Sequence, residues 1–221
     1  MKRRWIIDLT IVAGGFWAAL LAPALAGFYG SGPLAILVAL GLIALRLRAA
    51  GEDWGAIGLR APPPLPRLLL GAVALYVAVI AAVSFIAGPL SRALDWPPQD
   101  LGRFSEVAGH PRRLAALLLL TWTSAAVGEE VVFRGFLQGR LRRLLGAAPV
   151  PTAIAIALQA TLFGACHAYL GARGMLNAAI VGLVFGIGLV RSRGNLWPLI
   201  LAHGLTDTVT LTLLYLGYQV S

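Results

Sequence analysis

Long blocks of apolar residues dominate this sequence. They run approximately over residues 5–28, 33–47, 67–88, 112–136, 151–170, 174–191 and 195–217. Most approach about 17–22 residues, the length that an α-helix needs to cross the hydrocarbon core of a bilayer. The composition agrees, because 59% of the 221 residues are hydrophobic and only 12% are charged. The blocks predict an all-α, polytopic transmembrane bundle of about seven helices (six to eight), forming one membrane domain over residues 1–221.

Basic residues flank these blocks at alternate ends, which predicts an orientation. The segment between the first two blocks and the C-terminus carry none. By the positive-inside rule the N-terminus lies in the cytoplasm and the C-terminus outside, in the cell membrane. The loop at 89–111 fits less well, because Arg92 and Arg103 within it, and Arg112 and Arg113 directly after it, would lie outside. The residues that set the orientation are Lys2, Arg3, Arg4, Arg46, Arg48, Arg60, Arg67, Arg140, Arg142, Arg143, Arg191 and Arg193.

The formal net charge of +9 does not predict a nucleic-acid partner. The arginines flank apolar blocks and do not coat one face, as a nucleic-acid footprint would. The bilayer is the partner that this charge pattern indicates. The N-terminal 26 residues are similar to a signal peptide, but Asp8 interrupts the apolar stretch, so we interpret it as a retained first helix.

Six ionisable side chains lie within the apolar blocks of the C-terminal half. A charge at the bilayer centre costs about 2.5–3.5 kcal/mol, so such residues face a partner or a water-filled cavity. Three of the blocks contain one or more of them, and this clustering predicts an intramembrane polar cavity. The residues are Glu129, Glu130, Arg134, His167, His203 and Asp207.

The spacing of these residues gives different partners to the two adjacent glutamates. On a helix Glu130 and Arg134 are separated by four positions, with the glutamate first, which favours an ion pair. Glu129 points about 100° away and is free to face a cavity. The alternative is that both glutamates lie in a solvated turn. His203 and Asp207 share a face at the same spacing, suited to two ligands of one ion, a carboxylate orienting an imidazole, or a hydrogen-bonded pair joining helices.

The depth of Glu129 in the membrane depends on where its helix ends. If the helix ended at Gly128, Glu129 would lie at one membrane face and His167 near the other. We therefore expect the fourth helix to continue through "FRGFLQGRLRRLLG", with Arg140, Arg142 and Arg143 at the interface. Glu129, His167 and His203 then come to similar depths.

Three motifs in this order resemble those of the CAAX protease and bacteriocin-processing (CPBP, or Abi) family. "EEVVFRG", "FGACH" and "HGLTD" are similar to EExxxR, FxxxH and HxxxN/D. The resemblance covers residues 112–217, the expected catalytic core, and leaves 1–111 as helices and loops of uncertain role. It implies an intramembrane endopeptidase related to the type II CAAX prenyl endopeptidase.

The resemblance also implies a role for each residue. Glu129 would activate the attacking water and His167 would hold that water or a metal. Glu130 and Arg134 would form a supporting pair, and His203 would stabilise the oxyanion or bind metal. Asp207 stands where the prenyl endopeptidases have asparagine, and an ionised aspartate cannot donate a hydrogen bond. The family is described both as zinc-dependent and as glutamate-based; Zn²⁺ ligands would be Glu129, His167, His203 and Asp207.

The resulting expectation is hydrolysis of a membrane-associated or lipid-anchored peptide, at an active site that opens to the cytoplasm. Two alternatives stay open. One is a non-catalytic member of the family, such as an immunity or scaffold protein. The other is a proton-coupled carrier, because buried glutamates and histidines also relay protons. Carriers usually show paired repeats, however, and here the ionisable residues crowd into one half of the chain.

Overall fold

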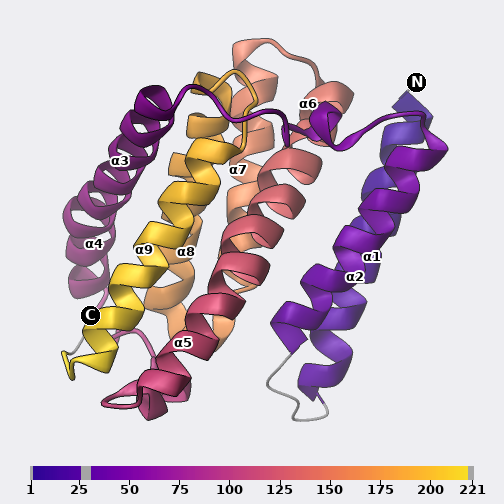
Figure 1. The fold of residues 1–221 in the computed structure, drawn as a ribbon. Helices are drawn as coiled ribbons and strands as arrows, with labels where there is room; N and C mark the ends of the chain where they lie inside the picture. The colour runs from indigo at the N-terminus through magenta and orange to yellow at the C-terminus, as the bar shows by residue number, and fades with distance from the viewer. Residues whose placement is uncertain (1, 26–30, 219–221) are drawn as a thin grey trace.

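The computed structural model describes residues 2–25 and 31–218, and within these residues the chain is helical without strands (Figure 1). The predicted all-α membrane bundle is confirmed. Each predicted block corresponds to a helix or a run of helices, although residues 26–28 of the first block lie outside the described residues. The elements are α1 (Lys2–Leu25), α2 (Ser31–Ala49), η1 (Trp54–Ile57), α3 (Leu65–Ala82), η2 (Val83–Ala87), α4 (Gly88–Ala93), η3 (Gly102–Val107), α5 (Pro111–Leu120), η4 (Thr121–Gln138), α6 (Gly139–Leu145), α7 (Pro149–Ala165), η5 (Ala168–Leu170), α8 (Gly171–Arg191) and α9 (Trp197–Tyr215).

Five helical stretches in the described part are long and apolar enough to cross a membrane. They are Lys2–Leu25, Ser31–Ala49, Leu65–Ala93, Pro111–Leu145 and Ala168–Arg191. The helix α7 is shorter, and α9 carries His203 and Asp207 within its apolar sequence. The chain is therefore a multi-pass membrane protein.

The fourth stretch continues unbroken from Pro111 to Leu145, as its predicted extension requires. Its centre differs from the expected α-helix, because Thr121–Gln138 is π-helical. A π-helix bonds each residue to the fifth one along and so has a wider turn, and such segments often occur at functional sites. Buried Glu130 and Arg134 remain neighbours across one such turn.

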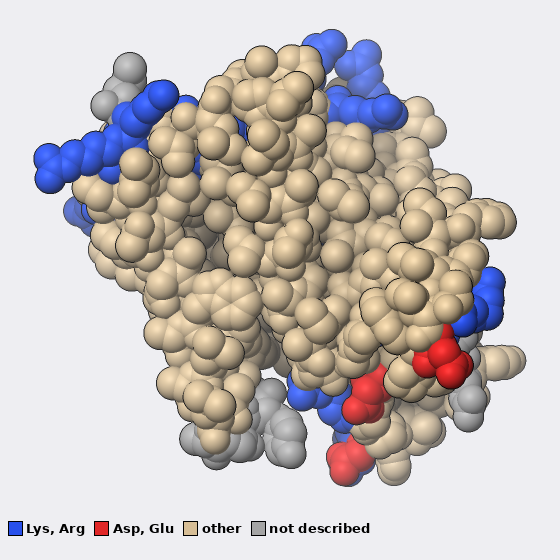
Figure 2. Space-filling view, turned by 180° about the vertical axis from the view of Figure 1, so that it is seen from behind, with Lys and Arg blue, Asp and Glu red and all other residues tan. Residues whose placement is uncertain are grey.

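The bundle has two ends, which the connections define. At the N-terminal end the loop after α2 meets the loop before α9, where the amide of Leu196 donates to the carbonyl of Gly58. At the C-terminal end the segment 94–110 meets the turn after α7 and the end of α9, through bonds from Asp100 to Leu170 and from Gly109 to Tyr215. The two chain termini lie at these opposite ends (Figure 1). Seen from behind, basic side chains gather at the N-terminal end, and the visible acidic ones lie at the other end with further basic side chains beside them (Figure 2).

A cluster of ion pairs attaches α1 to the rest of the bundle at the N-terminal end. Asp8 is fully buried, with its carboxylate 2.8 Å from Arg46 Nε and 3.1 Å from Arg140 Nε. Glu52 accepts from Arg140 at 2.6 Å and from Arg143 at 3.0 Å. Burial raises the pKa of Glu52, but the hydrogen bond and positive charge of Arg140 and its neighbours outweigh this and hold the pKa below its ordinary value. Asp8 thus links α1 to α2 and α6.

Replacing Asp8 by asparagine is expected to destabilise the protein. Breaking a buried ion pair by removing one partner costs about 3–5 kcal/mol when the remaining charge is left without a partner. Here the guanidinium of Arg140, which is 1% exposed, keeps Glu52 as its counter-charge, so we expect a smaller loss of about 1–3 kcal/mol. The measurement is thermal unfolding in detergent. Asp95→Asn, at an exposed position, should leave the unfolding temperature unchanged, and an equal effect of both substitutions would contradict the role of Asp8.

The glycines of the stretch "VGLVFGIGLV" in α8 let neighbouring helices pack closely. A Cβ atom at Gly182 would lie 2.8 Å from the Cα atom of Ala160 on α7. At Gly186 it would lie 2.8 Å from the side chain of Ile156 on the same helix. Gly188 faces Leu75 on α3. The glycines thus let α8 approach α7 and α3.

Candidate active site

A cavity of about 480 Å³ opens within the bundle and contains most of the predicted site residues. Glu129, His167, His203 and Asp207 line it, together with apolar residues of α1, α2 and α5. Its volume falls within the range of about 300–1,000 Å³ found for small-molecule and cofactor sites. The predicted polar cavity is therefore present in the bundle.

Three buried side chains, linked to one another by hydrogen bonds, support the site. Arg134 Nη1 donates to Glu130 Oε1 at 2.9 Å, and both side chains are fully buried. His203 Nδ1 lies 2.8 Å from the same oxygen. Since the Glu130 carboxylate accepts this hydrogen bond, His203 carries a proton on Nδ1, and its Nε2 atom points away from Glu130. The predicted Glu130–Arg134 pair is confirmed, and it also fixes the orientation of His203.

Two aromatic rings enclose the buried guanidinium. The Arg134 Cζ atom lies 4.1 Å from the centre of the Phe163 ring and 5.5 Å from that of Phe185. A cation over an aromatic face is stabilised by the negative charge of the ring surface. The His203 ring also contacts Phe185, at 5.8 Å between ring centres. These contacts hold the side chains of Arg134 and His203 in place within an apolar bundle.

Glu129 faces the cavity, while the adjacent Glu130 does not. Its side chain is 20% exposed, and Oε2 lies 3.9 Å from His203 Nε2. Asp207 approaches the same nitrogen at 3.5 Å, from one turn further along α9. One imidazole edge therefore has two carboxylates beside it, and the opposite edge is bonded to Glu130.

His167 lines the cavity from a turn and not from a helix, contrary to the block predicted for 151–170. The helix α7 ends at Ala165, because the chain must reverse through Gly171, whose φ of 76° suits glycine. His167 Nδ1 lies 2.8 Å from the carbonyl oxygen of Phe163, so the ring donates there and its Nε2 is an acceptor. The Phe163 and His167 rings pack together, at 4.7 Å between ring centres.

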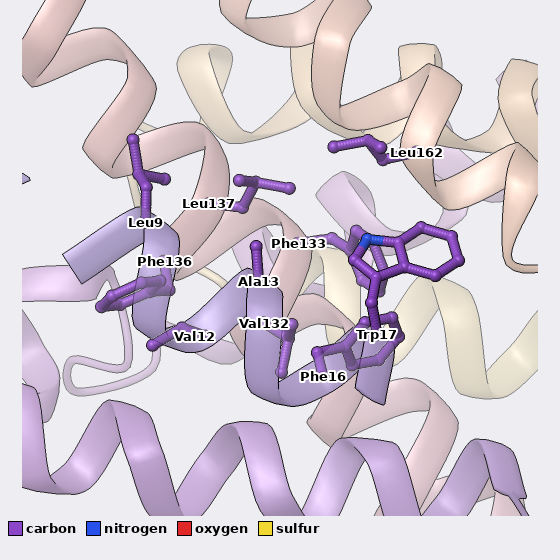
Figure 3. Close-up of a pocket in the computed structure, with 10 residues that line it drawn as sticks. All are labelled: Leu9, Val12, Ala13, Phe16, Trp17, Val132, Phe133, Phe136, Leu137 and Leu162. Atoms are coloured by element: carbon purple, nitrogen blue, oxygen red, sulfur yellow. The ribbon is translucent and has the colours of Figure 1, made fainter. Parts of the chain in front are cut away.

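A second, apolar crevice of about 20 Å³ lies between α1 and the Glu129-containing helix (Figure 3). Phe16 and Phe133 line both this crevice and the large cavity, and their rings pack edge to face at 5.5 Å. The crevice holds no ionisable side chain, so it forms the apolar wall of the site and adds no chemistry.

Four of the residues that line the cavity are the predicted zinc ligands: Glu129, His167, His203 and Asp207. Zinc takes three or four ligands at about 2.0–2.3 Å in tetrahedral geometry. No group of three histidine, cysteine, aspartate or glutamate residues within 2–25 and 31–218 is arranged to hold an ion. The donors that line the cavity are of the right chemical kind, and zinc binding stays a prediction.

Gly204 lets α9 approach the π-helical segment next to His203. A Cβ atom at Gly204 would lie 2.5 Å from the Trp122 ring, whose Nε1 donates to Thr208 on α9 at 3.2 Å. Gly204→Ala should therefore separate the two helices and cost about 1–3 kcal/mol, as overpacking does, lowering the unfolding temperature. Gly41→Ala, with open space around the new methyl, is the matched control. Equal stability of the two variants would contradict the close approach.

The fold and the cavity define a class: a multi-pass α-helical membrane protein with glutamate, aspartate and histidine side chains lining an internal cavity. Residues 111–209 match the model of the family described as type II CAAX prenyl endopeptidase Rce1-like. This match over residues 111–209 supports the assignment to a CAAX protease family that the three motifs predict. The family implies a protease. Neither the curated proteins nor the solved structures gave a significant match.

Proposed function

We propose that this protein is an intramembrane endopeptidase that hydrolyses a peptide bond of a membrane-associated or lipid-anchored substrate, with Glu129 as the base. The observation that carries the proposal is the different surroundings of the paired glutamates. Glu130 is committed to Arg134 and His203, whereas Glu129 faces the cavity beside His203 Nε2. A carboxylate facing a cavity is positioned to take a proton from water.

The reaction then proceeds by general-base catalysis. Glu129 removes a proton from water, and the oxygen adds to the scissile carbonyl carbon to form a tetrahedral oxyanion. His167 Nε2, an acceptor because Nδ1 is bonded to Phe163, holds the second hydrogen of that water. When the carbon–nitrogen bond breaks, Glu129 returns its proton to the leaving amine. The products are a carboxylic acid and an amine.

His203 stabilises the oxyanion in this mechanism. Protonated on both nitrogens, it donates from Nδ1 to Glu130 and from Nε2 to the developing negative charge. The carboxylate of Asp207, 3.5 Å from Nε2, faces the Nε2–H group of His203 while no substrate is bound. That role suits an aspartate, which accepts but does not donate when ionised.

The proposal is tested by cleavage of lipid-anchored and transmembrane peptides by purified protein in vesicles, with product masses as the readout. We expect cleavage with wild type and with His110→Ala, an exposed histidine outside the cavity, and none with His203→Ala. A metal chelator should leave the rate unchanged under the glutamate mechanism. Chelator inhibition reversed by zinc would overturn that mechanism and restore the predicted zinc site. Failure of wild type to cleave any peptide would favour a non-catalytic member of the family.

We also propose that the protein resides in the cell membrane with its N-terminus in the cytoplasm. The support is the basic N-terminal end of the bundle, which the positive-inside rule places in the cytoplasm. An enzyme that is active only outside the cytoplasm should be active when it is fused to the C-terminus as a reporter. Activity of a cytoplasmic reporter at that position would reverse the orientation.

A further inference from the structure

The cavity reaches the C-terminal end of the bundle. Besides the site residues, its lining includes the segment 99–104, the start of α2 and the last turns of α9. Arg103, exposed to solvent, stacks on Tyr169 at 3.9 Å from the ring centre, and both line the cavity. The cavity thus extends from Glu129, midway along its helix, to the loop between α4 and α5.

The path from the site toward the N-terminal end is filled by side chains. Every residue from Glu130 to Phe136 is buried, and so are Gln138 and Arg140. The amide of Gln138 donates to the carbonyl of Gly186 at 2.9 Å, and that of Gln159 to Gly182 at 2.7 Å. Packed and hydrogen-bonded side chains therefore close the bundle on this side of Glu129.

Basic residues mark the closed end. Of the 18 lysines and arginines, the C-terminal end holds only Arg92, Arg103, Arg112, Arg113 and Arg173, and Arg134 is buried beside Glu130. The remaining twelve lie at the N-terminal end, where the space-filling view shows a group of basic side chains (Figure 2). All the connecting loops are short, the condition under which basic residues determine orientation. The twelve are Lys2, Arg3, Arg4, Arg46, Arg48, Arg60, Arg67, Arg140, Arg142, Arg143, Arg191 and Arg193.

These observations conflict with one part of the sequence prediction. A cytoplasmic N-terminus and an active site open to the cytoplasm cannot both hold, because the cavity and the N-terminus lie at opposite ends of the bundle. The distribution of basic residues favours the cytoplasmic N-terminus. We propose that the cavity opens on the non-cytoplasmic side of the membrane and receives peptide segments exposed there, held by a lipid anchor or a transmembrane helix.

The substrate side of this proposal rests on the proposed peptidase function, whereas the direction of opening does not. A prenylated cysteine at the C-terminus of a cytoplasmic protein would lie on the cytoplasmic face of the membrane, opposite the opening of the cavity. The apolar residues that line the cavity, among them Leu117, Leu120 and Leu214, suit a peptide that approaches from the outer leaflet.

Cysteine accessibility tests the direction of opening without any need for activity. Cys166 is the only cysteine in the chain and lines the cavity. In a Cys166→Ser background, single cysteines are placed at exposed Ser105, in η3, and at exposed Ala148, between α6 and α7. Intact spheroplasts are treated with a membrane-impermeant sulfonated thiol reagent, and the thiols left free are then counted by mass shift with a maleimide polymer.

We expect Ser105→Cys to react at least tenfold faster than Ala148→Cys, and both to react equally after permeabilisation. Cys166 in the wild-type chain should also be modified from outside. The reverse order for the two variants would overturn the proposal, as would modification of Cys166 only after permeabilisation.

A second comparison tests the substrate side. A membrane-impermeant peptide should be cleaved at least tenfold faster by right-side-out vesicles than by inverted ones. Cleavage by inverted vesicles alone would overturn the proposed substrate side. Expected labelling with no cleavage in either vesicle would overturn the peptidase function and the substrates inferred from it, while the direction of opening would stand.

Discussion

Glu129→Gln is expected to abolish peptide cleavage while the protein folds normally. Glutamine keeps the size of the side chain and removes the carboxylate that takes the proton from water. Loss of a general base lowers the rate by about 10²–10⁴-fold. Because the Glu129 side chain is partly exposed to the cavity, its replacement should leave the unfolding temperature close to that of wild type. The measurement is the single-turnover rate in vesicles, with thermal unfolding of the same preparation.

The matched control is Glu106→Gln, because Glu106 is an exposed glutamate whose ion pair with Arg113 lies outside the cavity. It should cleave at the wild-type rate. A Glu129→Gln variant that keeps more than a tenth of the wild-type rate would exclude Glu129 as the base. Glu129→Asp, which moves the carboxylate back by one methylene, should lie between wild type and glutamine.

The bundle could be predicted from sequence because apolar blocks of membrane length leave few other folds. The Glu130–Arg134 pair could be predicted for a related reason, since its geometry is local to one turn of helix. The wider π-helical turn preserves that contact. Local spacing thus sufficed wherever both partners stand on the same helix.

Contacts between helices could not be read in this way. The bond from His203 to Glu130 joins residues 73 positions apart, and spacing alone pairs His203 with Asp207. The Asp8 cluster likewise depends on α1 lying beside α6. His167 was expected on a helix because nothing in "GACHAYLG" interrupts the apolar run before Gly171. The side on which the cavity opens relative to the N-terminus depends on all these contacts together, so the spacing of residues in the sequence does not determine it.

Removing one member of the Glu130–Arg134 pair is expected to destabilise the protein more than removing both. Glu130→Gln leaves a buried guanidinium without its counter-charge, and Arg134→Met leaves a buried carboxylate. Each single change should cost about 3–5 kcal/mol, the usual effect of breaking a buried pair. The double variant should be the more stable, because neither charge then remains buried alone. Chemical unfolding in mixed micelles measures all four free energies of unfolding.

The exposed pair Glu106–Arg113 provides a control with a similar distance, 2.9 Å, and much greater solvent exposure. Its double-mutant cycle should give a coupling below about 1 kcal/mol, against well above 1 kcal/mol for the buried pair. Additive single changes at Glu130 and Arg134 would contradict the pairing. Even when its stability is recovered, the double variant should not cleave peptides, because His203 has lost the carboxylate that orients it. Stability restored without activity would thus separate the support that Glu130 gives to the fold from its positioning of His203.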